Sequence, residues 1–249
     1  MPDRRTHRGP HPEDAVLFTT ETLPVLRQAV GDMSLLLSRG YAEKSSLKLV
    51  GDRYALNQRQ RTAVMRSSCS DEKLHQRQNS QIQPESVSQE LGILDGYNIL
   101  ITVEAALAGG VLLLGRDGCI RDLASIHGTY RKVSETLPAL EVISEILIKL
   151  NPSEVVWVLD KPVSNSGRLK GVILEFAAKK SLRWDVRLEM NPDKVLLESE
   201  HIIATSDSAV LDGCEKWLNL ARIVVENLTA NRNINLLDLR GISLSNNVN

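Results

Sequence analysis

The 249-residue sequence has few cysteines, and the three that it has, Cys69, Cys119 and Cys214, lie far apart. Because they form no CxxC pair, neither a disulfide framework nor a cysteine-based zinc site is expected, and the pattern predicts a cytoplasmic protein. Apolar runs are also short: residues 111–114 form one of the longest, whereas a membrane-spanning helix needs roughly 20 residues. No apolar stretch follows the charged N-terminus, so we expect neither a signal peptide nor contact with a membrane.

Aromatic residues and net charge are equally scarce. Two Phe, three Trp and four Tyr are present, and 30 basic residues face 31 acidic ones for a formal net charge of −1. A hydrophobic core must therefore depend mainly on Leu, Ile and Val. With 42% hydrophobic residues the chain is still typical of a globular protein, and no overall field directs it to nucleic acid.

Several catalytic motifs are missing. The sequence has no GxxxxGK[ST] loop and no GxGxxG fingerprint, which excludes the P-loop and dinucleotide-binding sites that these motifs build. HExxH and the GxSxG nucleophile elbow are absent too. A phosphatase of the haloacid dehalogenase type is disfavoured because Tyr97 stands where a second Asp would follow Asp95.

Composition divides the chain into four parts. Residues 1–20 are rich in Pro and charge and predict a disordered lead, and residues 21–75 predict a small, basic helical domain with helices over 24–38 and 57–67. Residues 76–90 are rich in Gln, Ser and Glu and predict a linker. In residues 91–249, short apolar runs alternate with helical patterns, including a long helix over 208–227, and predict an α/β domain with a largely parallel sheet flanked by helices. An Asp117-Gly118 turn predicts a hairpin within it.

Aspartates follow three of the predicted strands. Asp95, Asp160 and Asp207 each end an apolar run, and Asp212 lies about one helical turn after Asp207. The carboxyl ends of parallel strands meet at one edge of a sheet, where ligands bind. Carboxylates gathered there repel one another unless a cation compensates, and Mg²⁺ or Mn²⁺ prefers oxygen ligands. The pattern predicts a metal site able to hydrolyse a phosphodiester.

Each of these residues also has a structural explanation. A single Asp after a strand is commonly a helix cap, and Asp207 can cap the helix that follows it. Asp117 is explained as a turn residue, and His127 and His201 lack a metal-ligand partner at helical spacing. In the basic segment, Arg59 and Arg66 share one helix face and can bind phosphate. The alternative is that these arginines pair with nearby acidic residues.

The motifs resemble those of a known superfamily. Residues 95–98 (DGYN), following an apolar strand, are similar to the opening motif of NYN-type, PIN-like nuclease domains, and residues 205–208 (TSDS) resemble its late acidic motif. Asp160 matches the central acidic position. The chain also resembles a mainly archaeal, uncharacterised two-domain group, described as domain of unknown function 434 followed by a PIN-like domain. That likeness depends on residues 48–71, 117–131 and 159–167.

The resemblance implies a Mg²⁺- or Mn²⁺-dependent ribonuclease with Asp95, Asp160 and Asp207 as catalytic residues and metal ligands, joined by Asp212. Around them we expect substrate contacts from residues that share polar or basic side chains, namely Asn98, Ser164, Ser206, Arg121, Arg131, Arg59 and Arg66. Residues 117–131 have no counterpart in ordinary PIN domains. The alternatives are a non-catalytic RNA-binding module and a protein-interaction unit on the same scaffold. RNA is the expected partner, and a homo-oligomer is left open.

Overall fold

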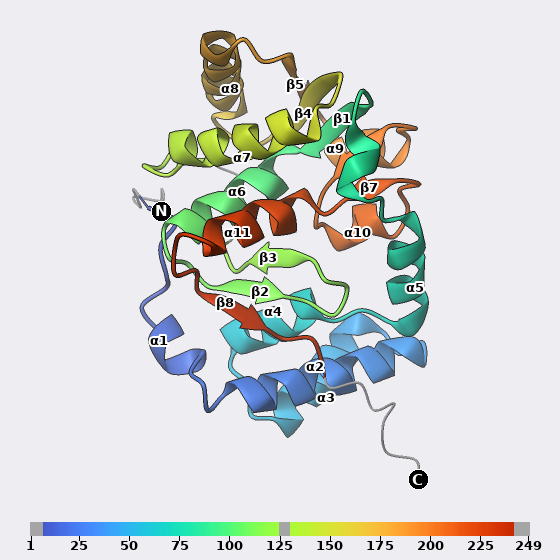
Figure 1. The fold of residues 1–249 in the computed structure, drawn as a ribbon. Coiled ribbons are helices and arrows are strands. Elements are labelled where there is room, and N and C mark those ends of the chain that lie inside the picture. The colour runs from blue at the N-terminus through green and yellow to red at the C-terminus, as the bar shows by residue number, and fades with distance from the viewer. Residues whose placement is uncertain (1–6, 125–129, 242–249) are drawn as a thin grey trace.

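In a computed structural model, described over residues 7–124 and 130–241, the fold centres on a five-stranded parallel sheet (Figure 1). Its order is β5-β4-β1-β6-β7, so the chain first adds strands on one side of β1 and then on the other. The strands are β1 Leu91–Asp95, β4 Glu154–Asp160, β5 Trp184–Glu189, β6 Ile202–Ala204 and β7 Trp217–Leu218. The largely parallel α/β sheet expected from the sequence is confirmed.

Both faces of this sheet are covered, which explains why its strands are apolar runs rather than alternating patterns. In β4, Val155, Trp157 and Leu159 join the core beneath one layer of helices, while Val156 and Val158 join the core on the other face. The first layer contains α6 Gly96–Leu107, α7 Thr136–Leu150, α8 Ser166–Lys180 and α11 Leu220–Thr229. The second contains the short helices α9 Pro192–Leu197 and α10 Ser208–Leu211.

A second, three-stranded sheet contains the predicted hairpin. Strands β2 Leu112–Leu114 and β3 Ile120–Asp122 pair antiparallel, and the turn between them includes Gly118 with a positive φ of 76°. This value lies in the region that glycine adopts without a steric cost. The final strand, β8 Leu236–Asp238, pairs in parallel with β2. It completes the small sheet and does not extend the large one.

The N-terminal region is helical as expected: α1 Asp14–Leu17, α2 Leu23–Ser38, α3 Glu43–Arg53, α4 Gln58–Ser67 and α5 Asp71–Ser80, followed by the 3₁₀ turn η1 Pro84–Val87. Helix α4 begins with a capping box, in which the Asn57 side chain accepts from the Gln60 backbone and the Gln60 side chain accepts from the Asn57 backbone. Reciprocal capping of this kind satisfies backbone donors at a helix start. Helix α3 was not predicted, because polar and charged residues interrupt its apolar pattern.

The N-terminal helices share one hydrophobic core with the small sheet. Buried residues of α2 and α4, among them Leu26, Met33 and Val64, pack with Val111 and Leu113 beside and within β2. Because side chains alternate along a strand, Leu112 and Leu114 face the opposite way, into the core under α6 and α11. In Figure 1 the small sheet accordingly lies between α2–α4 and the layer of α6 and α11.

Three sequence expectations differ from the structure. The expected lead is anchored from residue 7 onward, since Asp14 in α1 is buried against Arg59; residues 1–6 lie outside the described chain. Residues 71–80, partly assigned to a linker, form α5 with a Ser70 cap. The long helix expected over 208–227 is wrong: α10 ends at Leu211, the chain forms β7, and α11 begins at Leu220. Burial of Trp217 and Leu218 in the sheet interrupts the helical pattern.

Within the described residues, no helix has both the length and the apolarity needed to cross a membrane.

Gly96 is required where α6 starts against β4. A Cβ at this position would lie 2.8 Å from the Val158 carbonyl oxygen and 2.5 Å from Leu159 Cδ2. Gly96→Ala should therefore lower the free energy of unfolding by about 1–3 kcal/mol, the usual cost of overpacking, as measured by urea denaturation. The matched control is Gly171→Ala in α8, where a Cβ meets no atom within 4 Å. Because alanine has a better helix propensity than glycine, Gly171→Ala should increase stability slightly. Equal losses of unfolding free energy in both variants would contradict the packing argument.

Candidate functional site

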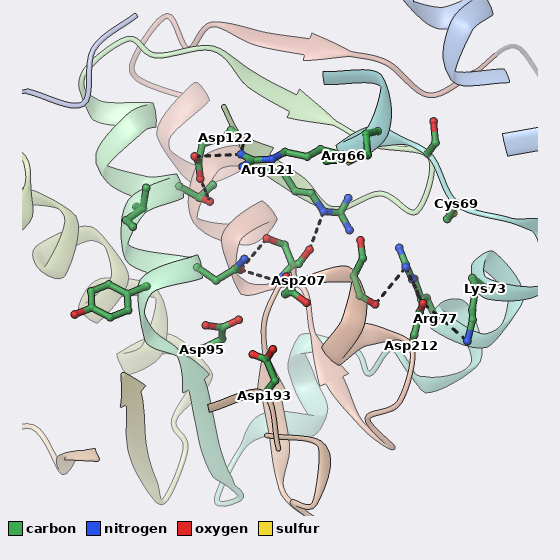
Figure 2. Close-up of a pocket in the computed structure, with 18 of the residues that line it drawn as sticks. Arg66, Cys69, Lys73, Arg77, Asp95, Arg121, Asp122, Asp193, Asp207 and Asp212 are labelled. Carbon is green, nitrogen blue, oxygen red and sulfur yellow. Dashed lines mark hydrogen bonds and ion pairs between the residues drawn. The ribbon is translucent and has the colours of Figure 1, made fainter. Parts of the chain in front are cut away.

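The carboxyl ends of the central strands open into a cavity of about 630 Å³ (Figure 2). Strand order reverses between β1 and β6, and such a switch point is where ligands bind in open α/β sheets. Asp95 at the end of β1, Asp160 at the end of β4 and Asp207 after β6 all line this cavity. Asp193 in the first turn of α9 lines it too. Figure 2 shows Asp95, Asp193 and Asp207 pointing toward a common space.

Asp95 is the most deeply placed of these carboxylates. Burial raises its pKa to about 7, and the nearby carboxylates of Asp207 and Asp193 add to this effect. The Thr205 hydroxyl donates a hydrogen bond of 2.8 Å to the Asp95 carboxylate, which favours the charged form and partly opposes the shift. Asp95 is therefore poised between its protonated and charged forms near neutral pH.

Asp160 and Asp193 are shifted in the same direction. Burial raises the pKa of Asp160, helped by the Asp193 carboxylate, and burial raises the pKa of Asp193, helped by Asp207. Among the described residues, none of the four carboxylates has a Lys, Arg or His within ion-pair distance. Nor do any three His, Cys, Asp or Glu side chains in that part of the chain form a ready metal-binding group. The donors are all hard carboxylate oxygens, which suit Mg²⁺ or Mn²⁺ by type, but they are not gathered into a completed coordination shell.

The turn after β6 is fixed by hydrogen bonds from neighbouring elements. The Asn98 side-chain oxygen in α6 accepts from both the backbone amide and the hydroxyl of Ser206, each at 2.8 Å. Asp207 accepts from the backbone amides of Ala209 and Val210, so it does cap α10 as the structural alternative predicted. Because one carboxylate oxygen makes both capping bonds, capping leaves the other oxygen uncommitted. Asn98 and Ser206 thus position Asp207 at the cavity.

Asp212 lines the same cavity but is paired with basic side chains, so its placement does not support the expectation that it is a metal ligand. Its carboxylate lies 2.7 Å from a guanidinium nitrogen of Arg77 in α5, and Lys73 Nζ lies 3.9 Å away. The expected long helix would have placed Asp212 one turn beyond Asp207. Instead α10 ends at Leu211, and Asp212 turns toward the N-terminal helices.

Arg121 was expected to contact substrate, but it is held inside the protein. Its guanidinium forms two hydrogen bonds with Asp117, at 2.6 and 2.9 Å, and donates to the Ser206 carbonyl at 2.7 Å. Arg77 binds the same Asp117 carboxylate at 2.5 Å. Burial alone would raise the pKa of Asp117, but the two guanidinium groups hold it well below its usual range. Arg121 borders the cavity while its donors support the turn that carries Asp207.

The remaining expected substrate contacts divide between two environments. Arg59 pairs with the buried Asp14 and does not line the cavity, so the expected shared role with Arg66 is not supported by their placement. Arg66 does line it, and donates to the Asp122 and Ala124 carbonyls. Ser164 and Arg131 are exposed away from the cavity lining, although the Ser164 carbonyl accepts from the Tyr130 amide. Residues 125–129 of the distinctive segment 117–131, with His127, lie outside the described chain.

Two cavity residues were missed from the sequence. Asp193 follows strand β5 by only a few residues, in the sequence Asn191-Pro192-Asp193, and this helix-start pattern could have revealed it. Lys73 lies on α5, which begins in a segment whose sequence shows almost no apolar periodicity. No local motif distinguishes it from a surface lysine.

Comparison with known families places the chain in a family without an assigned activity. Residues 84–223 match the family described as a domain of unknown function (DUF5616), and the chain belongs to that family. Residues 25–79 match a protein family of unknown function (DUF434), so the two-part uncharacterised group expected from the motifs is supported. An uncharacterised protein of Methanocaldococcus jannaschii is 29% identical over 186 residues, covering 75% of this chain and 88% of that protein. No solved structure matches.

Proposed function

We propose that this protein is a metal-dependent ribonuclease of the PIN-like class, which hydrolyses a phosphodiester bond at the cavity beyond β1, β4 and β6. The observation that carries the proposal is the group formed by Asp95, Asp160, Asp193 and Asp207. These four carboxylates share one cavity, and among the described residues they lack a basic partner. Asp95, Asp160 and Asp207 are half-buried and Asp193 is exposed. Because like charges held close together repel one another, the arrangement favours a bound cation.

The strand order supports the fold class in this proposal. Counted along the chain, the five strands of the large sheet follow the order 3-2-1-4-5, with the carboxylates at the point of reversal. RNA, rather than another phosphodiester, is proposed from the resemblance of residues 95–98 and 205–208 to NYN-type motifs. The three cysteines are free and buried, which agrees with the cytoplasmic location that we propose.

Each side chain has a defined part in this proposal. Asp95, Asp160, Asp193 and Asp207 would hold Mg²⁺ or Mn²⁺, which when bound activates water and stabilises charge on the phosphate. Thr205 orients the Asp95 carboxylate, and Asn98 with Ser206 holds the turn that presents Asp207. Arg121 supports the same turn by donating to the Ser206 carbonyl. Asp95 must lose its proton to bind a cation, so cation affinity should rise as the pH passes about 7.

Metal binding is tested by thermal melting of the full chain with Mn²⁺ or Mg²⁺. An ion that binds the folded state at 100 times its Kd adds about 2.7 kcal/mol by mass action, so the native melting temperature should rise by several degrees. Asp95→Asn should show no rise, and Glu200→Gln, which removes an exposed carboxylate outside the cavity lining, should behave as native. Equal rises in native and Asp95→Asn protein would place the ions elsewhere.

Cleavage of a fluorescent single-stranded RNA in Mn²⁺ then separates a nuclease from a binding module. The native protein and Glu200→Gln should cleave it, while Asp95→Asn and Asp207→Asn should lose more than 100-fold in rate, as expected when a metal site that activates water is lost. The lack of a ready metal-binding group among the described residues favours the alternative of a non-catalytic RNA-binding module. RNA binding by native protein without any metal-dependent cleavage would select that alternative.

A further inference from the structure

One wall of the cavity carries basic side chains, each of which lies beside a carboxylate. Four basic side chains line the cavity, and three of them come from the N-terminal helices: Arg66 from α4, and Lys73 and Arg77 from α5. Two of the four, Arg77 and Arg121, are held in buried ion pairs. Arg77 and Arg121 share the Asp117 carboxylate, Arg77 also binds Asp212, and both side chains are almost fully buried.

Lys73 and Arg66 differ from that pair, because each keeps donors that no described group uses. Lys73 Nζ lies 3.2 Å from the Gln76 side-chain oxygen and 3.9 Å from Asp212, and its side chain is 37% exposed. Arg66 Nη1 donates to two backbone carbonyls, at 2.5 and 3.2 Å, and lies 3.8 Å from the Asp122 carboxylate; the Arg66 side chain is 29% exposed. Its Nε and Nη2 have no partner among the described residues. The two side chains therefore present ammonium and guanidinium donors to an anion entering the cavity.

The positions of these donors suit an extended anion. In Figure 2, Arg66 at the top and Lys73 at the right lie apart from each other, and both lie away from Asp95 and Asp193. A phosphodiester strand whose reacting phosphate meets the carboxylate end carries a further negative charge one nucleotide away. Lys and Arg are the side chains that neutralise such phosphates.

The size of the cavity limits what can enter. Its volume of about 630 Å³ falls in the range of sites for small molecules, roughly 300–1,000 Å³. Leu37, Glu43 and Met65 from the N-terminal region also line it. An unpaired strand can place one or two nucleotides in such a space, whereas a duplex is too wide to enter.

We propose that Lys73 and Arg66 each bind a phosphate of a single-stranded RNA whose reacting phosphate meets the carboxylates, so that the N-terminal helices select unpaired strands. This inference rests on the proposed function. In this proposal Asp212 is a positioning residue. Its carboxylate holds Arg77 and keeps Lys73 near the cavity.

The test is a salt series of binding to fluorescein-labelled single-stranded RNA, measured by anisotropy in Ca²⁺, with a gel check that the probe stays intact. Lys73→Gln and Arg66→Gln should each raise Kd several-fold and lower the slope of log K against log salt by about 0.7 for each phosphate that is no longer neutralised. Lys73→Arg should restore both quantities. Lys149→Gln, which replaces an exposed lysine of α7 outside the cavity lining, removes the same charge and should match native protein.

A duplex of the same sequence should bind the native protein weakly and show no further weakening on Lys73→Gln. The inference would be overturned if Lys73→Gln and Arg66→Gln both kept the Kd and the salt slope of native protein. It would also be overturned if native protein bound duplex and single-stranded RNA equally well. If native protein and both variants also cleave RNA equally in Mn²⁺, the proposed function stands without the inference. If native protein binds with the expected salt slope yet never cleaves, the basic wall is upheld and the nuclease proposal fails.

Discussion

Asp95→Asn should stabilise the folded protein at pH 8 in the absence of divalent ions. The unfolded aspartate has a pKa near 3.9, and burial raises that of the folded group to about 7, so the folded state loses stability as pH rises between these values. The full difference of about three pKa units corresponds to about 4 kcal/mol above pH 7. Because the amide is neutral and can still accept from Thr205 Oγ1, the variant should avoid about 2–4 kcal/mol of this cost.

Urea denaturation at several pH values, with EDTA present, measures this effect. The difference in free energy of unfolding between Asp95→Asn and native protein should be near zero at pH 4, grow up to pH 7 and stay constant above it. Adding Mn²⁺ should narrow the difference at pH 8, since only native protein gains from the ion. Glu200→Gln should show no pH-dependent difference. A less stable Asp95→Asn protein at pH 8 would contradict the assignment of Asp95 as an uncompensated buried carboxyl group.

Asp117→Asn should be strongly destabilising. Asp117 is the shared partner of Arg77 and Arg121, and all three side chains are almost completely buried. Removing one member of a buried ion group leaves the others uncompensated, which costs about 3–5 kcal/mol. We expect a loss of this size in urea denaturation at pH 7. The fluorescence of Trp217, whose indole donates to the Arg77 carbonyl, should also report a change near α5.

Asp52→Asn is the matched control for this prediction. Asp52 also contacts two cations, Lys48 and Arg61, but on the exposed surface of the N-terminal helices. Surface ion pairs contribute little to stability, so this variant should unfold close to the native protein. A loss for Asp52→Asn that equals the loss for Asp117→Asn would show that burial is not the source of the effect.

Much of the framework could be predicted from the sequence because its signals are local. The apolar strand over 155–159 is long and rich in β-branched residues, and the Asp117-Gly118 turn determines a hairpin within a few residues. Asp95, Asp160 and Asp207 could be expected at one cavity because chain direction alone brings the carboxyl ends of parallel strands together.

The rest depends on interactions between distant segments. Asp212 and Lys73 are 139 positions apart in number, and no periodicity indicates that α5 packs beside α10. Arg59 and Arg66 share a helix face, yet Arg59 meets Asp14, a residue expected in a disordered lead. The end of α10 at Leu211 likewise follows from burial of Trp217 and Leu218 in the sheet, which overrides a continuous helical pattern.

The small sheet has a consequence for how this chain can be divided. Two sequence families meet between residues 79 and 84, but the side chains of Val111, Leu113, Leu123 and Leu239 fill a core built largely by the earlier family's helices. Because they share this core, we expect the two sequence units to fold as one cooperative unit. A fragment lacking the first unit would expose an apolar surface and leave Asp117 with one guanidinium partner fewer. Inactivity of such a fragment would report misfolding, and the two units should be gained, lost or exchanged in evolution only as a pair.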